Sequence, residues 1–426
     1  MLRANFPQTA GSNNMTKKKK NNVSIQAKKA GDKQLDARFL ERIKFIAKAM
    51  IGEEKFDLIP SYFFEAVTTL RVPVLKARKA TPESDILKST VVQYNKLFTA
   101  FINEHTIETD YKIEIPLGWY FNEGIVLLNY ISMMPDNHFS EAAMLKEAFK
   151  EYLPGSEHHT WLGNVLEVTI FDANVFLSEP DKFVIHADMT DTAYINPETT
   201  SNAISIQRVR TEKTKVLVDD HYRTTLKVGW VLADEKWEYP SIKPAQIGFE
   251  GEGADVPVHI YIQQHAINKL QERIDITPGI LYFGLGGSFM DEHISYVKKD
   301  NYSLVAYFLS EQKVGYLLCK WCDNKILITT FLFLTNDGTP EGKKLRELLL
   351  LEKADKAYLG IDTMPHFNSY HFEKDEWLSN LFIEAGCGSL LKIGHLEEFS
   401  KKSIADKDPE SIHKYISDFA LFKKGK

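Results

Sequence analysis

Three strongly apolar runs follow one another between residues 302 and 335, joined only by short polar connections: "YSLVAYFL", "KVGYLLCKW" and "KILITTFLFLT". Runs rich in β-branched and aromatic residues that are joined so closely are typical of neighbouring strands. Asp323 and Asn324 supply the turn chemistry of a β-hairpin. The sequence therefore predicts an antiparallel meander in this part of the chain.

An amphipathic helix is predicted before this meander, in the stretch "IYIQQHAINKLQERIDI" at residues 260–276. At 100° per residue, an apolar stripe runs along one side, and a second stripe beside it carries a histidine and two cations. The apolar stripe consists of Ala266, Ile267, Leu270 and Ile274, and the cationic one of His265, Lys269 and Arg273. A helix that packs its apolar stripe on an antiparallel sheet gives an α+β fold.

The region from residue 35 to 153 is expected to be mainly helical. Apolar residues recur there at helical spacing, and Gly52 follows as a stop signal: Leu35, Phe39, Ile43, Ile46 and Met50. A second helix is predicted after Thr81, which would cap it, with Pro82 in its first turn. A third helix is predicted to begin at Ser140.

A β-rich middle is expected from residue 154 to 250, because several β-branched, alternating segments occur there: "VLEVTIFDANVFL", "KFVIHAD", "AISIQRV", "TKVLVDD" and "TTLKVGWVLA". The glycine-rich "GFEGEGADVP" at 248–257 is predicted to be a linker. A C-terminal α+β domain with a helical tail then covers residues 257–426. It includes a helix that begins at Thr339 and Pro340.

The charge of the chain is divided unevenly. Residues 1–34 carry eight Lys or Arg and one acid, +7, so the remainder of a chain of net charge −6 carries −13. An acidic body argues against general coating of nucleic acid, whereas the basic leader is either disordered or in contact with phosphates or anionic surfaces.

No secretory signal and no long apolar run is present, and three cysteines fit a reducing compartment. The expected location is cytoplasmic, with no membrane partner.

The cationic stripe suits a phosphodiester, since Arg and Lys neutralise phosphate and His transfers protons near neutral pH. Here "HAINKLQER" resembles the His-Ala-x-x-Arg-x-x-Glu-Arg helix of small toxin-like domains in the barnase, colicin and RelE class of ribonuclease folds. His265, Ala266, Glu272 and Arg273 match that helix, and Lys269 replaces its first arginine. "ILITT" resembles a late strand of the same domains.

The resemblance implies metal-independent RNA cleavage by transesterification. His265 is the implied general acid or base, and Lys269 and Arg273 would stabilise the phosphorane, with Thr329 or Thr330 facing the groove. The alternative is structural: His265 lies on the surface, while Lys269 and Arg273 extend over the apolar stripe and pair with Glu272 or other acids.

No cofactor or metal is expected. Cys319 and Cys322 lie before a turn and not at the start of a helix, so they are predicted to be two hydrophobic cysteines of a hairpin. A zinc site that adds Cys387 and His395 is left open. Histidines and carboxylates also gather in "EHHTW", "IHADMTD" and "VDDHYR", without the spacing of a known metal site.

Two functions therefore remain open from the sequence. The first is an RNA-interacting protein whose C-terminal domain is a metal-independent ribonuclease that uses His265, Lys269, Arg273 and Thr329. The second is a non-enzymatic interaction or accessory protein with an inactive toxin-like domain. RNA or another protein is the expected partner, and the oligomeric state is open.

Overall fold

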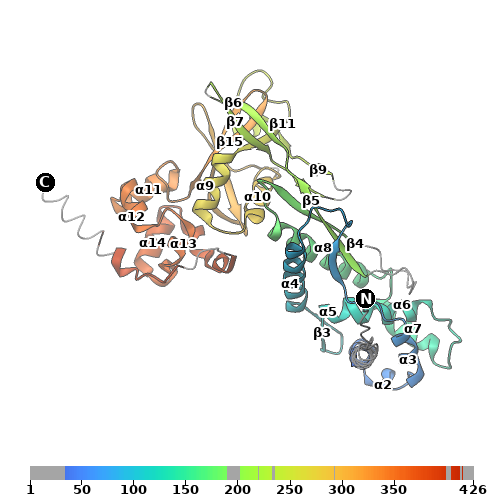
Figure 1. Cartoon of the computed structure of the whole chain (residues 1–426). Coiled ribbons are helices and arrows are strands. Elements are labelled where there is room, and N and C mark those ends of the chain that lie inside the picture. The colour runs from blue at the N-terminus through green and yellow to red at the C-terminus, as the bar shows by residue number, and fades with distance from the viewer. Residues whose placement is uncertain are drawn as a thin grey trace, which may run out of the picture. The chain divides into compact units, whose positions relative to one another are not determined.

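A computed structural model describes residues 34–189, 202–218, 220–232, 236–291, 293–399, 404–412 and 415. The basic leader lies outside these residues, apart from its last position. The chain forms two compact units (Figure 1): unit 1 contains residues 1–79, 88–170 and 188–205, and unit 2 contains 80–87, 171–187 and 206–426. These units divide the chain differently from the four segments expected above. The predicted α+β class is confirmed.

Unit 1 is mainly helical. Residues 34–51 form a helix that ends before Gly52, whose φ is 80°. The other elements are α2 (Glu53–Phe56), α3 (Ser61–Thr69), α4 (Lys88–Glu104), α5 (Leu117–Trp119), the π-helical turn η1 (Tyr120–Gly124), α6 (Ile125–Met133), α7 (Ala142–Phe149), η2 (Lys150–Tyr152), the first part of α8 (Glu157–Leu177), strand β1 (Lys76–Lys79) and the hairpin of β2 (Thr106–Glu108) and β3 (Glu114–Pro116). Ile43, Phe63 and Tyr120 are completely buried in its core.

The prediction of a strand at "VLEVTIFDANVFL" is wrong, because this segment lies inside α8. The buried residues of α8 include Leu162, Leu166, Ile170 and Ala173, which recur at helical spacing. Ser156 caps the helix by accepting a hydrogen bond at Oγ from the backbone N–H of His159 at 3.1 Å. Helical packing thus overrides the β propensity of the valines and isoleucine.

The predicted cap at Thr81 is also wrong. Helix α4 begins at Lys88, and residues 81–84 form a turn in which the N–H of Ser84 donates to the carbonyl of Thr81 at 3.1 Å. Pro82 occupies the second position of that turn, which its fixed φ favours as much as it favours a first helical position.

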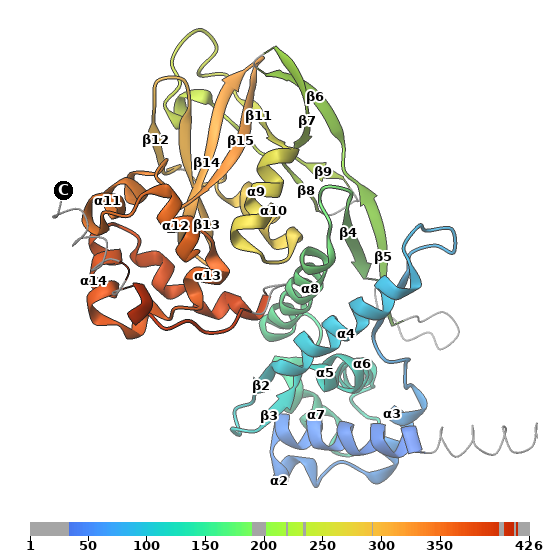
Figure 2. The ribbon, with the colours of Figure 1, turned by 60° about the vertical axis from the view of Figure 1, so that its left-hand side comes forward.

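Unit 2 is built on a sheet that has eight strands among the described residues and is drawn in Figure 2. Its order is β12-β13-β14-β15-β11-β7-β6, and β10 also pairs with β11. Among the described strands of this sheet, β11 and β15 form a parallel pair and the other pairs are antiparallel. The strands are β6 (Lys213–Val218), β7 (His221–Lys227), β10 (Ser241–Ile242), β11 (Val258–Gln263), β12 (Tyr296–Lys298), β13 (Ser303–Leu309), β14 (Gln312–Cys322) and β15 (Lys325–Phe333). The predicted meander is therefore confirmed as β13, β14 and β15.

Smaller strands complete the described set. β4 (Phe183–Met189) and β5 (Ala203–Arg210) form a sheet of order β1-β5-β4, and β8 (Trp230–Val231) pairs with β9 (Trp237–Glu238). The short helix η4 (Pro244–Ile247) precedes the segment that the sequence suggested as a linker. That segment lies within unit 2, where Phe249 belongs to the core.

Helices α9 (Gln264–Ile274) and α10 (Pro278–Gly287) pack on the sheet of unit 2 (Figure 2). The predicted apolar stripe of α9 is buried as expected, and Asp275 ends the helix in the left-handed conformation. The C-terminal helices gather beside α9 and β14: α11 (Pro340–Leu349), α12 (Lys353–Leu359), α13 (Met364–Asn368), η5 (Phe372–Lys374), α14 (Glu376–Glu384), η6 (Gly388–Lys392) and η7 (Gly394–Phe399). Thr339 caps α11 as predicted, because its Oγ1 accepts from the N–H of Gly342 at 2.9 Å.

Candidate functional site

The cationic stripe of α9 is largely paired within the chain. His265 is exposed in the first turn of the helix. One turn later, Lys269 Nζ donates to Glu272 Oε2 at 2.7 Å. A further turn on, the Arg273 guanidinium donates to the backbone carbonyl of Asp362 at 2.8 Å and also to the Asp362 carboxylate.

The pair of Arg273 and Asp362 is the most enclosed part of this stripe. Their side chains are 17% and 18% exposed, so both charges are mostly shielded from water. Asp362 lies just before α13, and α13 packs against α9. Because one guanidinium contacts both a carbonyl and a carboxylate there, the pair joins the end of α9 to the C-terminal helices.

Thr329 is not brought to the cationic stripe. Leu318 pairs with Thr330 and Cys319 with Ile328, so Thr329 is the extra residue of a β-bulge. Ile328 belongs to the core cluster that includes the apolar stripe of α9, and Leu327 belongs to a separate cluster on the opposite face. Ile328 and Phe331, on either side of the bulge, both belong to the core cluster, so Thr329 and Thr330 between them face away from it. The Thr329 Oγ1 donates to the Leu318 carbonyl at 3.2 Å.

The geometry leaves one exposed imidazole beside two cations that already have partners. An incoming phosphate would have to displace Glu272 from Lys269 and Asp362 from Arg273 to use them. Displacing the second partner would leave a carboxylate unpaired in a half-buried position, which is costly. The stripe in this form is suited to holding helices together more than to holding an anion.

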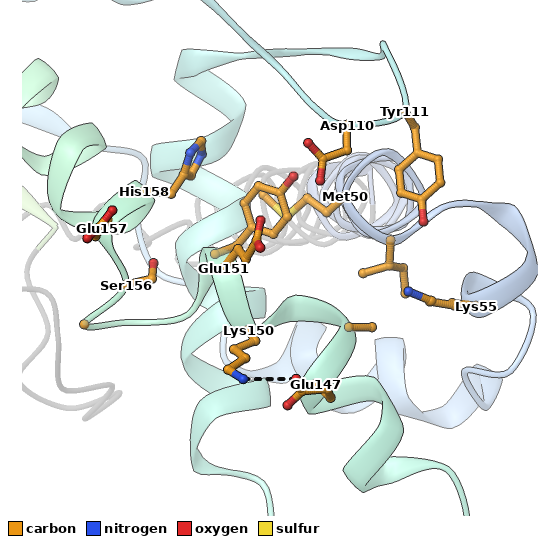
Figure 3. A pocket seen from close by; sticks show the side chains of 14 residues that line it. Met50, Lys55, Asp110, Tyr111, Glu147, Lys150, Glu151, Ser156, Glu157 and His158 are labelled. Atoms are coloured by element: carbon orange, nitrogen blue, oxygen red, sulfur yellow. Dashed lines mark hydrogen bonds and ion pairs between the residues drawn. The ribbon is translucent and has the colours of Figure 1, made fainter.

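Unit 1 contains a second candidate, a polar cavity of about 940 Å³. Figure 3 shows its walls, which come from the helix at residues 34–51, α2, the turn between β2 and β3, α7 with η2, and the start of α8. The lining contains two lysines, four carboxylates and one histidine: Lys55, Asp110, Glu147, Lys150, Glu151, Glu157 and His158. Lys150 Nζ donates to Glu147 Oε1 at 3.1 Å, the pair drawn with a dashed line.

His158 is the titratable group of this cavity whose surroundings are best defined. Burial lowers its pKa, while the charges of Glu151 and Asp110 act in the opposite direction. Its ring meets the Tyr152 ring edge-on, with 5.0 Å between centroids, and its Nε2 is buried without a hydrogen-bond partner in the described residues. A buried imidazole nitrogen without a partner is uncommon in a protein, and it makes His158 the first residue of this cavity to test by substitution.

The sequence drew attention to His158 but not to its surroundings. Asp110, Glu151 and Lys55 come from three separate segments, and no spacing in the sequence links them. No group of three or more His, Cys, Asp or Glu side chains among the described residues has the geometry of a metal site. The sets considered above, including Cys387 with His395, therefore do not form one within this part of the chain.

Cys319 and Cys387 are buried, whereas Cys322 is only partly buried. Cys319 is completely buried in β14, and Cys322 packs beside Leu327. Burial raises the pKa of Cys319, and it raises the pKa of Cys387 to about 12. Thiols held in the protonated state are poor nucleophiles and poor metal ligands.

None of the helices described in the structure combines the length and the apolar character needed to cross a bilayer. Comparisons of the chain with known protein families, with curated proteins and with solved structures found no match.

Proposed function

We propose that this protein is a non-enzymatic interaction or accessory protein of the cytoplasm, in which the toxin-like helix α9 has a structural role. The observation that carries this proposal is the pairing of Arg273 with Asp362 inside unit 2. A ribonuclease that stabilises a phosphorane needs its arginine available at the groove, because the planar guanidinium must form two bonds to the phosphoryl oxygens.

Three further features support the structural role of α9. Lys269 is paired with Glu272 at 2.7 Å, Thr329 lies on the other face of β15, and the chain beyond the leader is acidic. An acidic surface repels the RNA backbone and slows its approach. With Lys269 and Arg273 paired and Thr329 on the other face, His265 has no partner for catalysis among the four residues that the sequence suggested.

A ribonuclease is the second candidate, and the exposure of His265 favours it. The basic leader, of charge +7, would supply an electrostatic contact to RNA. In this alternative, RNA displaces Glu272 and Asp362 as it binds, and His265 transfers the proton.

The test is incubation of the full chain with mixed single-stranded RNA in EDTA. Wild type is compared with His265→Ala and with His259→Ala, a matched control at another exposed histidine of unit 2. We expect no cleavage by any of the three folded proteins. Cleavage by wild type and His259→Ala that is lost in His265→Ala would overturn the proposal and establish the ribonuclease.

A further inference from the structure

Unit 2 contains an apolar pocket of about 310 Å³, and none of its lining residues lies in α9. It is formed by the last turns of α8, by α10, and by the hairpin of β8 and β9. This volume is at the lower end of the range for small-molecule sites, and an apolar lining with few polar groups is characteristic of them.

Aromatic rings form the wall of this pocket. The Phe283 ring lies 5.2 Å from Phe171 and 5.5 Å from Trp230 between centroids, at interplanar angles of 69° and 81°. Trp230 and Tyr282 are buried at the base. Rings held nearly perpendicular to one another make a corner that offers both faces and edges to a ligand.

The mouth of the pocket is open and apolar. Phe283 is 44% exposed and Met290 is 76% exposed, although both are large hydrophobic side chains. At Gly286 and Gly287, which also line the pocket, a Cβ would meet no atom within 4 Å. Covering exposed apolar side chains around a concave site is energetically favourable, and such a patch is typical of a binding surface.

One carboxylate faces the same pocket. Glu238 pairs directly with Trp230 across β8 and β9, so the two side chains project from the same face of the hairpin. Among the described residues, no cation lies within ion-pair distance of the Glu238 carboxylate.

Two tyrosines of the lining make contacts of their own. The ring of Tyr239 is stacked on Trp237 at 5.8 Å and has the Lys227 ammonium 3.8 Å from its centroid. The Tyr282 hydroxyl donates to the Lys227 carbonyl at 2.8 Å. Glu238 is therefore the charged group of the lining that can bind a ligand.

We infer that this pocket binds a small organic cation with an apolar, preferably aromatic, body. The body would fill the space between Phe171, Trp230 and Phe283, and the ammonium group would lie at the mouth against Glu238. Aromatic faces attract a desolvated cation, and the carboxylate adds a charge-assisted hydrogen bond. The inference is independent of the role of α9, since no residue of that helix lines the pocket.

The first test compares three probes that share one skeleton: phenylbutylamine, phenylbutanol and phenylbutyrate. Binding to the full chain is measured by calorimetry and by quenching of tryptophan fluorescence. We expect the amine to bind at least about tenfold more tightly than the alcohol, and the carboxylate to bind weakest, because one charge-assisted contact is worth about 1.4 kcal/mol or more. Equal binding of all three, or binding of none, would overturn the inference.

Two variants locate the binding. Glu238→Gln should remove the preference for the amine while the alcohol binds as before. Gly286→Leu should abolish binding of both by filling the pocket, whereas Gly163→Leu, at another helical glycine with open space around its Cβ, should leave binding unchanged. Helical content and melting temperature confirm that each variant is folded. Binding that survives in folded Gly286→Leu would place the ligand elsewhere and overturn the inference.

Discussion

At the scale of single residues, the chemistry of α9 depends on a partner that is 89 positions away in the sequence. From the sequence, Arg273 is expected to be an exposed cation beside an apolar stripe, yet its guanidinium is bound by Asp362. Helical periodicity places a side chain on a face of its own helix, but it does not reveal which distant segment covers that face. The pairing with Glu272 is local, at three positions, and the sequence did suggest it.

The structural role of Arg273 predicts a loss of stability that is absent at His265. Arg273→Met should lower the free energy of unfolding by about 1 to 3 kcal/mol, because it leaves the Asp362 carboxylate half-buried without its partner. His265→Ala should change it by less than about 0.5 kcal/mol, since that side chain is exposed. Urea denaturation measures both. A double variant with Asp362→Asn should be less destabilised than the sum of the single variants, and strict additivity would contradict the pairing.

Lys356 provides a second prediction at this scale. Its side chain is 2% exposed, and its ammonium donates to the carbonyls of Thr335 at 2.9 Å and Gly342 at 2.7 Å and to the Asp337 carboxylate. Lys356→Met should cost about 3 to 5 kcal/mol, because it leaves those acceptors buried and unpaired. Lys353→Met, at the exposed first residue of the same helix, is the matched control and should be nearly neutral. Equal stability of the two variants in urea would contradict this account.

At the scale of elements, prediction succeeded where one local signal dominated. The stripe of α9, the Thr339 cap of α11 and the Asp323-Asn324 turn each specify their structure within a few residues. It failed at α8, where β-branched residues favour a strand and only the packing of Leu162, Leu166 and Ile170 selects a helix. The polar cavity and the aromatic pocket were not predictable, because each joins several segments that are distant in the sequence.

The hairpin of β14 and β15 gives a prediction about its turn. Asp323 and Asn324 have φ values of 48° and 56°, and a two-residue hairpin turn of type I′ requires positive φ at both of its central residues. Asn324→Gly should stabilise the protein by about 0.5 kcal/mol, because glycine has no Cβ to strain in this conformation. Asn324→Val should destabilise it by about 1 to 2 kcal/mol. Thermal unfolding measures both changes, and a stabilising valine would show that the turn has a different conformation.

The first turn of α8 gives a prediction about pH. Burial lowers the pKa of both His158 and His159 below the ordinary value of 6.5. The unfolded chain therefore binds more protons than the folded chain below that pH, so stability falls as the pH decreases through 6.5 towards the folded pKa values. Replacing both histidines with glutamine should reduce this loss. Urea denaturation of wild type and variant across this range tests it, and parallel curves would contradict the assignment.

At the scale of the whole molecule, the chain passes between its two units several times, so neither unit is a single contiguous segment. Unit 2 takes residues 171–187 from before the expected C-terminal domain as well as 206–256. β7 pairs with β11 through Leu226 and Ile262, and Gly279 of α10 closely approaches the Val175 carbonyl of α8. A domain that starts at 257 lacks both contacts.

This organisation predicts different fates for two fragments. Residues 257–426 alone would expose one edge of β11 and the apolar side chains that Leu226 and Trp230 cover, so we expect this fragment to aggregate or to unfold without cooperativity. Residues 171–426 retain β6 to β9 and the end of α8, so this fragment should melt cooperatively. Circular dichroism during heating distinguishes them. A cooperative transition in the shorter fragment would instead support an independent domain that begins at 257, and unit 2 would then be an extension of that domain.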